Sequence, residues 1–302
     1  MPHTVPMQIA FIGAGRMGGR MIRRLLDAGH EVVVCDEAPA ALEAAVEHGA
    51  RAAATPGDAA RAGTPFVLCS LPAPDITEHV LCGPDGAVAA AAPGTVLVDL
   101  GTGDPGTARR IAAVCERAGV GFLDAPVSRG VAAAETGTLA MLVGGGEDTL
   151  AAARPVLDML ATDVVHVGPV GAGQVAKLCN NMLAAINATA LGEVLVAGVR
   201  AGVDLEALAA AVGAGSGSSY VLEAYLPRGL FTAERPTGFA LSLMRKDVGL
   251  FLRAGSELGV TLPVSALVGQ LYAAARSEGL DEADWTSVAE VYERMAGVRL
   301  AL

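Results

Sequence analysis

The sequence predicts an α/β fold in which a doubly wound, mostly parallel sheet is followed by an all-helical domain. Over the first half of the chain, short apolar runs alternate with alanine-rich helical stretches, as parallel strands joined by crossover helices do. Beyond the glycine-rich segment 168–173 the strand signals stop and helical stretches remain. We therefore expect one domain over residues 1–170 and an all-helical domain over 171–302.

Length and charge limit the classes of function. A chain of 302 residues with 52% hydrophobic content can bury the cores of two domains. Its formal net charge is −11, and runs of Lys or Arg that could contact phosphate backbones or anionic lipid are scarce. We expect neither a nucleic-acid partner nor a membrane partner.

The strands are expected where apolar runs are bounded by turn residues. These runs cover residues 9–12, 32–35, 66–69, 96–98, 121–123, 139–143 and 164–167. The first run leads directly into a glycine-rich turn and then a helix over 17–28. That turn consists of Gly13, Ala14, Gly15, Arg16, Met17 and Gly18.

This strand, turn and helix predict a dinucleotide site. In such a turn the first glycine allows the tight bend, the second lets a pyrophosphate approach the backbone, and the third permits close helix packing. The second strand ends at Asp36, where an acid is expected to bind the ribose hydroxyls and to repel a 2′-phosphate. NAD is therefore favoured over NADP. Asp36 could also be only a turn former, and Arg16 only a solvated side chain beside the phosphates.

Ligands of open α/β sheets lie beyond the carboxyl ends of the strands. Three such ends stand out: Cys69 to Pro72, which includes Leu71, then Asp99 to Thr102, then Asp124 to Gly130. Simpler interpretations exist, because Pro72 could only stop a strand and Thr102 could only cap the helix that begins near Pro105.

The segment 171–183 reads as a helix that is apolar almost all round and therefore buried. Lys177 and Asn181 are four residues apart, so they share one face, where an unpaired ammonium would be costly to desolvate. This pair indicates a functional cleft. The alternative is that Lys177 extends to solvent and Asn181 caps a backbone group. Polar residues within 175–199 argue against a membrane span.

Neither a metal site nor export is expected. The five cysteines are scattered without metal or redox spacing and read as small hydrophobic residues in a reducing compartment. The N-terminal residues lack the basic flank and apolar core of an export signal. The expected location is the cytoplasm.

Taken together, these segments resemble the β-hydroxyacid dehydrogenase family over essentially the whole chain. The resemblance is carried by the glycine turn, by Asp-Ala-Pro-Val-Ser at 124–128 and by Gly-Thr-Leu at 137–139. It continues through Lys177 to Asn181, Lys-Asp-Val at 246–248 and the segment 259–264. It implies a Rossmann-like domain, a helical domain joined to it through a long helix, and assembly as a homodimer or homotetramer.

The resemblance also implies roles for individual residues. Lys177 corresponds to the catalytic lysine, and Asn181 to its partner that helps to hold the substrate. Ser128 and Gly130 correspond to the loop that receives the substrate carboxylate. Leu71, Pro72, Thr102 and Lys246 correspond to positions at the NAD site.

The chain departs from the family pattern at Arg129, which stands where the substrate loop usually has glycine. Its side chain could point outward, or its guanidinium could bind a second anionic group of the substrate. A further departure lies at 99–102, where relatives often have serines, so that hydrogen bonding to the cofactor would rest more on Thr102.

The expected reaction is reversible oxidation of a small 3-hydroxy acid by NAD, with a lysine as acid and base. The same chemistry could run mainly as reduction of a semialdehyde. The chain could instead be a non-catalytic NAD-binding interaction module, but the Lys177 and Asn181 pair and the lack of a basic segment argue against this. Imine reductases share the architecture but typically replace the lysine, so Lys177 argues against that class of enzyme.

Overall fold

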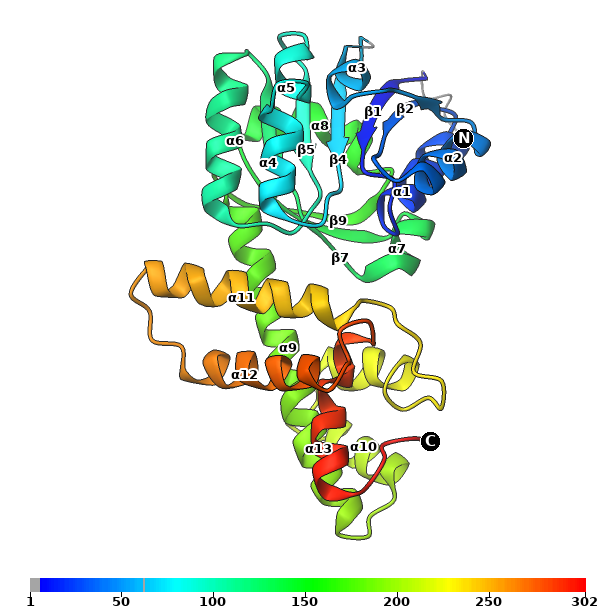
Figure 1. Cartoon of the computed structure of the whole chain (residues 1–302), viewed down its shortest axis with the longest axis vertical. Helices are drawn as coiled ribbons and strands as arrows, with labels where there is room; N and C mark the ends of the chain where they lie inside the picture. Colours follow the sequence, from blue (N-terminus) through cyan, green and yellow to red (C-terminus); the bar gives the residue numbers. More distant parts are fainter. Residues whose placement is uncertain (1–5, 62) are drawn as a thin grey trace. The chain divides into compact units, whose positions relative to one another are not determined.

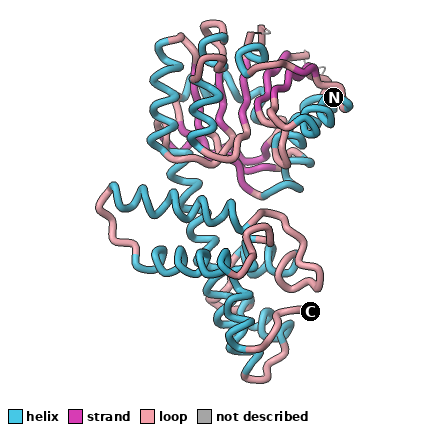
Figure 2. The backbone as a smooth tube through the Cα atoms, viewed as in Figure 1, coloured by secondary structure: helices cyan, strands magenta, loops and turns pink. Residues whose placement is uncertain are grey.

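The structure is a computed structural model that describes residues 6–61 and 63–302. It forms two compact units, Met1–Lys177 and Leu178–Leu302 (Figure 1). The first unit contains every named strand, and the second is built from helices (Figure 2). The expected fold class is therefore confirmed.

The sheet of the first unit has the strand order β3-β2-β1-β4-β5-β6-β8-β7, and β9 pairs with β8. The first six of these strands are parallel, whereas β8 is antiparallel to both β6 and β7. The two-residue strands β3 and β7 were not expected from the sequence. The strands are β1 (Gln8–Ile12), β2 (Glu31–Cys35), β3 (Arg51–Ala52), β4 (Phe66–Cys69), β5 (Val96–Asp99), β6 (Gly121–Asp124), β7 (Val127–Ser128), β8 (Leu139–Gly144) and β9 (Ala161–Gly168).

The crossover helices begin where local residues favour a helix start. Four of them have proline in the first helical turn, where its missing N–H leaves no intrahelical bond unmade. Asp104 caps α6 by accepting the N–H of Thr107 at 2.8 Å, so Thr102 is not the cap of that helix. The helices are α1 (Gly18–Asp27), α2 (Pro39–Glu47), α3 (Pro56–Ala60), α4 (Pro74–Cys82), α5 (Ala87–Ala90), α6 (Pro105–Arg117), α7 (Gly130–Thr136) and α8 (Glu147–Leu157).

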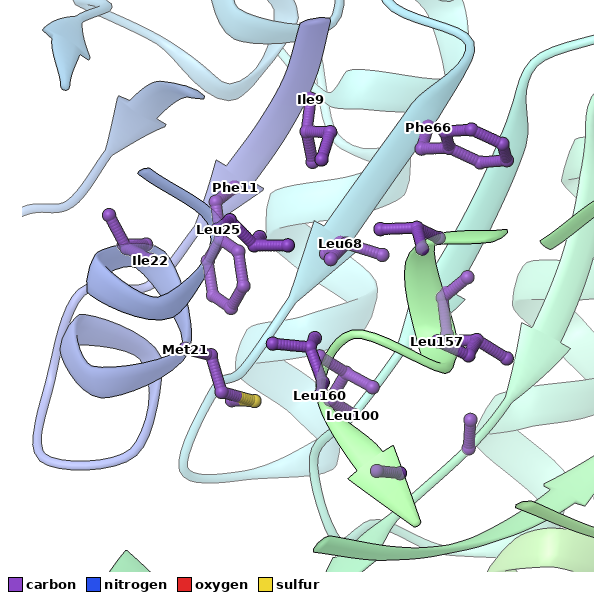
Figure 3. Packing of buried hydrophobic residues seen from close by; sticks show 14 of the residues in the cluster. Ile9, Phe11, Met21, Ile22, Leu25, Phe66, Leu68, Leu100, Leu157 and Leu160 are labelled. Carbon is purple, nitrogen blue, oxygen red and sulfur yellow. The ribbon is translucent and has the colours of Figure 1, made fainter. Parts of the chain in front are cut away.

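Successive strand residues point to opposite faces of the sheet, so β1 contributes to two cores. Ile9 and Phe11 pack with α1 and α8 on one face (Figure 3), whereas Ala10 and Ile12 pack with α3 to α6 on the other. Helices on both faces explain why the central strands read as continuous apolar runs.

The described residues of the second unit form helices and their connecting loops, and their one β-type pairing is an isolated bridge between Ala240 and Asp284. Its core contains the chain's single tryptophan, Trp285, which is 3% exposed, and Tyr272, which donates to the carbonyl of Trp285 at 3.0 Å. The helices are α9 (Ala172–Arg200), α10 (Leu205–Gly213), η1 (Val221–Tyr225), η2 (Leu226–Arg228), α11 (Leu241–Glu257), α12 (Pro263–Ser277), η3 (Trp285–Ala289) and α13 (Glu290–Ala296).

The helix α9 begins in the first unit and continues into the second. The sequence places the domain boundary after Val170. In the structure the chain divides after Lys177, because the first turn of α9 is bonded to residues of the first unit. By length and composition α9 could also cross a membrane, but a core helix passes the same test. Gln174 and Lys177 are buried and hydrogen-bonded within the first unit, as expected of a core helix.

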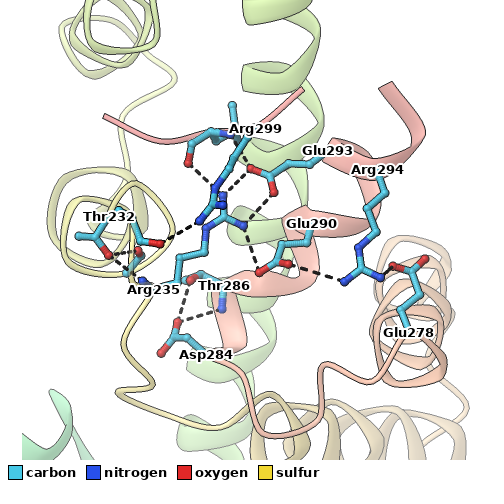
Figure 4. Close-up of polar contacts among 12 residues, drawn as sticks. Thr232, Arg235, Glu278, Asp284, Thr286, Glu290, Glu293, Arg294 and Arg299 are labelled. Atoms are coloured by element: carbon cyan, nitrogen blue, oxygen red, sulfur yellow. Dashed lines mark hydrogen bonds and ion pairs between the residues drawn. The ribbon is translucent and has the colours of Figure 1, made fainter. Parts of the chain in front are cut away.

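A buried ion cluster fastens the end of the second unit (Figure 4). Arg235 makes a two-pronged contact with Glu293 at 2.7 and 2.8 Å, pairs with Glu290 at 3.0 Å and donates to the carbonyl of Leu300. Burial opposes the charge, but the bonds to Glu293 raise the pKa of the Arg235 guanidinium. The cluster therefore joins the loop around residue 235, α13 and the C-terminal segment.

Arg235→Met should lower the free energy of unfolding of the second unit by about 3 kcal/mol, because two carboxylates would lose their shared cation in a buried setting. Urea unfolding followed by Trp285 fluorescence measures this effect. Arg253→Met is the matched control at an exposed position of α11 and should change stability by less than about 0.5 kcal/mol. Equal midpoints for the two variants would contradict the account.

Candidate active site

The glycine turn between β1 and α1 has the geometry that a dinucleotide requires. Gly13 has a φ of +94°, and a Cβ there would lie 2.4 Å from the carbonyl oxygen of Ser70. A Cβ on Gly18 would lie 1.9 Å from the carbonyl oxygen of Gly13, whereas a Cβ on Gly15 would meet nothing within 4 Å. Two glycines therefore serve the packing of the turn, and Gly15 leaves open space for a ligand.

Asp36 lies beside this turn. Its carboxylate accepts the N–H of Ala14 through Oδ2 and the N–H of Ala38, at 2.7 Å, through Oδ1. The N–H of Gly13 donates to the carbonyl of Cys35 at 2.9 Å, which joins the turn to the end of β2. A fixed carboxylate beside an open glycine turn fits the ribose and pyrophosphate of NAD. Arg16 belongs to the same turn and has an exposed side chain, and its contact with the phosphates remains a prediction.

The loops after β4 and β5 adjoin the glycine turn. The side chain of Leu71 would be 3.1 Å from a Cβ on Gly13, and the Leu71 carbonyl oxygen would be 2.9 Å from a Cβ on Gly101. Asp99 accepts the N–H of Gly101 at 2.9 Å and so shapes the loop that holds Thr102. The structure therefore brings the predicted cofactor residues of the two loops to one edge of the sheet. Their contacts with NAD remain predictions.

Lys177 is 7% exposed, so its ammonium does not extend to solvent. Its Nζ donates to Oγ of Ser128 at 3.0 Å, which joins two residues that the sequence assigns to catalysis and to the substrate loop. Gly130 has a φ of +75°, and a Cβ there would meet nothing within 4 Å. The turn at 128–130 therefore offers open backbone beside a buried amine.

Arg129 adopts a left-handed conformation, with a φ of +83°, at the position where the family pattern has glycine. Its guanidinium pairs with Asp163 at 2.7 Å and donates to the hydroxyl of Thr162 at 3.0 Å and to the carbonyl of Thr138 at 3.1 Å. Both side chains of the ion pair are substantially exposed, so water competes with this pair.

Asn181 and Lys246 both contact the buried carboxylate of Asp247 in the second unit. Nδ2 of Asn181 donates to Oδ2 of Asp247 at 2.6 Å, and Nζ of Lys246 pairs with Oδ1 of the same carboxylate at 3.1 Å. The side chain of Asp247 is 1% exposed. Asp247 therefore orients Asn181 on α9 and anchors Lys246 on α11.

Sequence reasoning did not assign roles to Asp124, Gln174 or Asp247, although each adjoins a predicted site residue or motif. Asp124 is fully buried at the end of β6 and accepts the N–H groups of Gly171 at 2.7 Å and Gln174 at 2.9 Å. Burial raises the pKa of the Asp124 carboxyl, and these N–H groups act in the opposite direction. The carboxylate thus caps the start of α9.

One signal in the sequence could have strengthened the site prediction. Lys177 and Lys246 are the only lysines in the chain, and every other residue of the Lys and Arg class is arginine. Lysine, whose amine can lose its proton, therefore occurs at only these two positions. In the structure Lys177 contacts Ser128, and Lys246 contacts Asp247.

Among the described residues, 6–61 and 63–302, no group of three or more His, Cys, Asp or Glu side chains could hold a metal ion. At Lys177 and Ser128 the structure places an amine and a hydroxyl beside an open turn. Such a pair can exchange a proton with a bound hydroxyl or carbonyl group.

Comparison with known proteins finds two family models that match this chain. The model of the NAD binding domain of 6-phosphogluconate dehydrogenase matches residues 8–168. A second model, described as the NAD-binding domain of NADP-dependent 3-hydroxyisobutyrate dehydrogenase, matches residues 171–292. The two models together span both structural units.

Similar proteins cover nearly the whole chain. A 2-(hydroxymethyl)glutarate dehydrogenase of Eubacterium barkeri is 38% identical over 98% of both chains. A 3-hydroxyisobutyrate dehydrogenase of Pseudomonas aeruginosa is 39% identical over 94% of this chain and 98% of its own. Among solved structures, a Mycobacterium tuberculosis 3-hydroxyisobutyrate dehydrogenase with L-serine has a TM-score of 0.87 and 34% identity, over 95% of this chain and 99% of that chain.

Fold, site and comparisons define the chain as an NAD-binding oxidoreductase that acts on the CH–OH group of small 3-hydroxy acids. More particularly, it belongs to the β-hydroxyacid dehydrogenase family. The family and cofactor expected from the sequence are thereby confirmed.

Proposed function

We propose that Lys177 is the acid and base of this dehydrogenase and that Ser128 and Gly130 receive the substrate carboxylate. The bond of 3.0 Å between Nζ of the buried Lys177 and Oγ of Ser128 carries the proposal. This contact supports the proposal because it holds the amine next to the turn that is proposed to receive the carboxylate. An ammonium is expensive to bury for structural reasons alone, so its retention favours a chemical role.

Bound NAD supplies the acceptor for the hydride that leaves the alcohol carbon. In oxidation, the uncharged amine of Lys177 takes the hydroxyl proton as the carbon–oxygen bond becomes a carbonyl. In reduction, the ammonium returns that proton to the carbonyl oxygen.

The remaining predicted residues hold the two ligands. Asn181 follows Lys177 by one turn of α9, so the two side chains leave the same face of the helix. We assign Asn181 to the substrate, with Asp247 orienting its amide. The cofactor residues are the glycine turn, Asp36, Leu71, Pro72, Thr102 and Lys246.

A screen of small 3-hydroxy acids for NADH formation tests the proposal. The panel contains 3-hydroxyisobutyrate, L-serine and 2-(hydroxymethyl)glutarate, because relatives are named for them or hold them. At least one acid should be turned over with NAD, and NADP should react at least about tenfold more slowly because Asp36 repels a 2′-phosphate. If none of the acids were turned over, the proposed function would be contradicted.

The preferred direction is proposed to be oxidation, with semialdehyde reduction as the alternative. NADH consumption with the corresponding semialdehydes compares the two directions. The proposed location is the cytoplasm, because all five cysteines are free thiols. The proposed assembly is a homodimer or homotetramer. Light scattering coupled to gel filtration measures the assembly.

A dicarboxylic substrate is a second candidate, favoured by the position of Arg129 next to Ser128. The ion pair of Arg129 with Asp163 is exposed and costs little to break, so a second carboxylate could replace Asp163 as its partner. The relative named for 2-(hydroxymethyl)glutarate makes this acid the appropriate probe.

Arg129→Gly should raise KM for 2-(hydroxymethyl)glutarate by about tenfold, the loss expected for one hydrogen bond between charged groups. KM for 3-hydroxyisobutyrate should stay within about twofold, because that acid has no second carboxylate. Steady-state kinetics with both acids provides the comparison. Unchanged KM values for both acids would show that the guanidinium serves only its contacts within the protein.

A further inference from the structure

Gln174 bonds through its side chain to a single loop of the first unit. It is the third residue of α9 and is 1% exposed. Its Oε1 accepts the N–H of Gly103 at 2.8 Å, and its Nε2 donates to the carbonyl of Gly101 at 2.9 Å. These two glycines flank Thr102 in the loop after β5. Both ends of the buried amide are therefore satisfied by the loop that is proposed to contact NAD.

The backbone around Gln174 is attached to a second strand end. Its N–H and that of Gly171 donate to the two carboxylate oxygens of Asp124, at 2.9 and 2.7 Å, and Asp124 ends β6. A Cβ on Gly173 would lie 2.4 Å from the carbonyl oxygen of Leu142 in β8, so helix and sheet are in direct backbone contact. These contacts join the first turn of α9 to the sheet, and the side chain of Gln174 adds its link to the loop 101–103.

Lys177 follows Gln174 by three residues, so both side chains leave one face of the same rigid helix. The Gln174 amide therefore sets where the loop 101–103 lies relative to Nζ of Lys177. Proton transfer and hydride transfer need this relation, because both must occur in one arrangement of substrate and cofactor.

We propose that Gln174 is a positioning residue that couples the cofactor loop Gly101–Gly103 to Lys177. It touches neither reacting group. It transmits the order that NAD imposes on the loop to the first turn of α9. The inference rests on the proposed roles of Thr102 and Lys177, and it adds a contact by which cofactor binding aligns the base.

The first experiment measures the coupling without turnover. Hydrogen–deuterium exchange is followed with and without NADH in the wild type, in Gln174→Met and in Gln270→Met, a matched control at an exposed position of α12. NADH should slow exchange in segments 99–104 and 171–178 of the wild type and the control. In Gln174→Met it should slow exchange only in 99–104. Equal NADH-dependent protection of 171–178 in both variants, or none in the wild type, would overturn the proposal.

The second experiment separates positioning from folding. Gln174→Met should lower kcat by about 10- to 100-fold, as a misplacement of about 1 Å does, with KM and the Kd of NADH within about threefold. A C3-deuterated acid should show a larger isotope effect on kcat in this variant, because hydride transfer becomes limiting. An unchanged kcat, or a loss confined to stability, would refute the role. If the wild type turns over no acid, the proposed function fails, and the exchange experiment still decides the coupling.

Gln174→Glu provides a rescue in an isosteric side chain. Its carboxylate cannot donate to the carbonyl of Gly101, but its protonated form can, and burial favours protonation. The ratio of its kcat to that of the wild type should therefore rise as the pH falls. A ratio that is constant or falls with decreasing pH would contradict the proposal.

Discussion

Lys177→Met should reduce kcat by about 10³-fold while the Kd of NADH stays within about twofold. The thioether keeps most of the volume of the lysine stem but cannot exchange a proton, and general acid and base groups typically contribute this factor. The affinity should persist because the glycine turn, Asp36 and the loop at Thr102 are unchanged. Steady-state kinetics and fluorescence titration with NADH provide the two measurements.

Ser128→Ala is the companion variant because it removes the partner of Nζ and leaves the amine in place. A smaller fall in kcat is expected, together with a higher KM for the acid, since Ser128 is assigned to the substrate carboxylate. If Lys177→Met kept turnover close to that of the wild type, the amine would not be the proton carrier.

Gly15→Ala and Gly18→Ala should both weaken NAD binding but should differ in stability. A Cβ on Gly15 meets no protein atom within 4 Å, so its methyl group would occupy only the space proposed for the pyrophosphate. A Cβ on Gly18 would lie 1.9 Å from the carbonyl oxygen of Gly13, so the turn itself must move. We expect the Kd of NAD to rise by about 100-fold or more in each variant.

Thermal unfolding distinguishes the two glycines. The Tm of Gly15→Ala should match that of the wild type, whereas Gly18→Ala should lose several degrees, as a cost of about 2 kcal/mol implies. Gly249→Ala, within α11, is the control: a Cβ there meets only a distant arginine nitrogen, and the replacement should not destabilise the protein. Normal NAD binding by Gly15→Ala would place the pyrophosphate elsewhere.

The central strands could be predicted because parallel strands buried on both faces are apolar at every position. The run 66–69 coincides with β4, and the run 121–123 falls one residue short of β6, which continues to the buried Asp124. The strands β3 and β7 were missed because two exposed or half-buried residues leave no apolar run. The strand β9 begins at Ala161, before the predicted run 164–167. Its start was missed because Thr162 and Asp163 are polar and exposed at the sheet edge, so they do not extend the apolar run.

The site was predicted where chemistry and spacing lie close together in the sequence. The glycine turn and Asp36 form one short segment, and Lys177 stands out as a charge on an apolar helix. The contacts of Gln174 with Gly101 and Gly103 join residues 73 and 71 positions apart, and those of Asp124 with α9 span 47 and 50 positions. No local pattern encodes such pairs, because they arise when strand ends meet at one edge of the sheet.

The most direct test of the central claim compares Lys177→Arg with Lys177→Met in single-turnover NADH formation. Arginine keeps the positive charge and can donate to Ser128, but it does not give up its proton at accessible pH. If Lys177 carries the proton, both variants should form NADH about 10³-fold more slowly than the wild type. If Lys177→Arg instead formed NADH at a rate close to that of the wild type, the residue would supply only charge, and its assignment as the acid and base would be wrong.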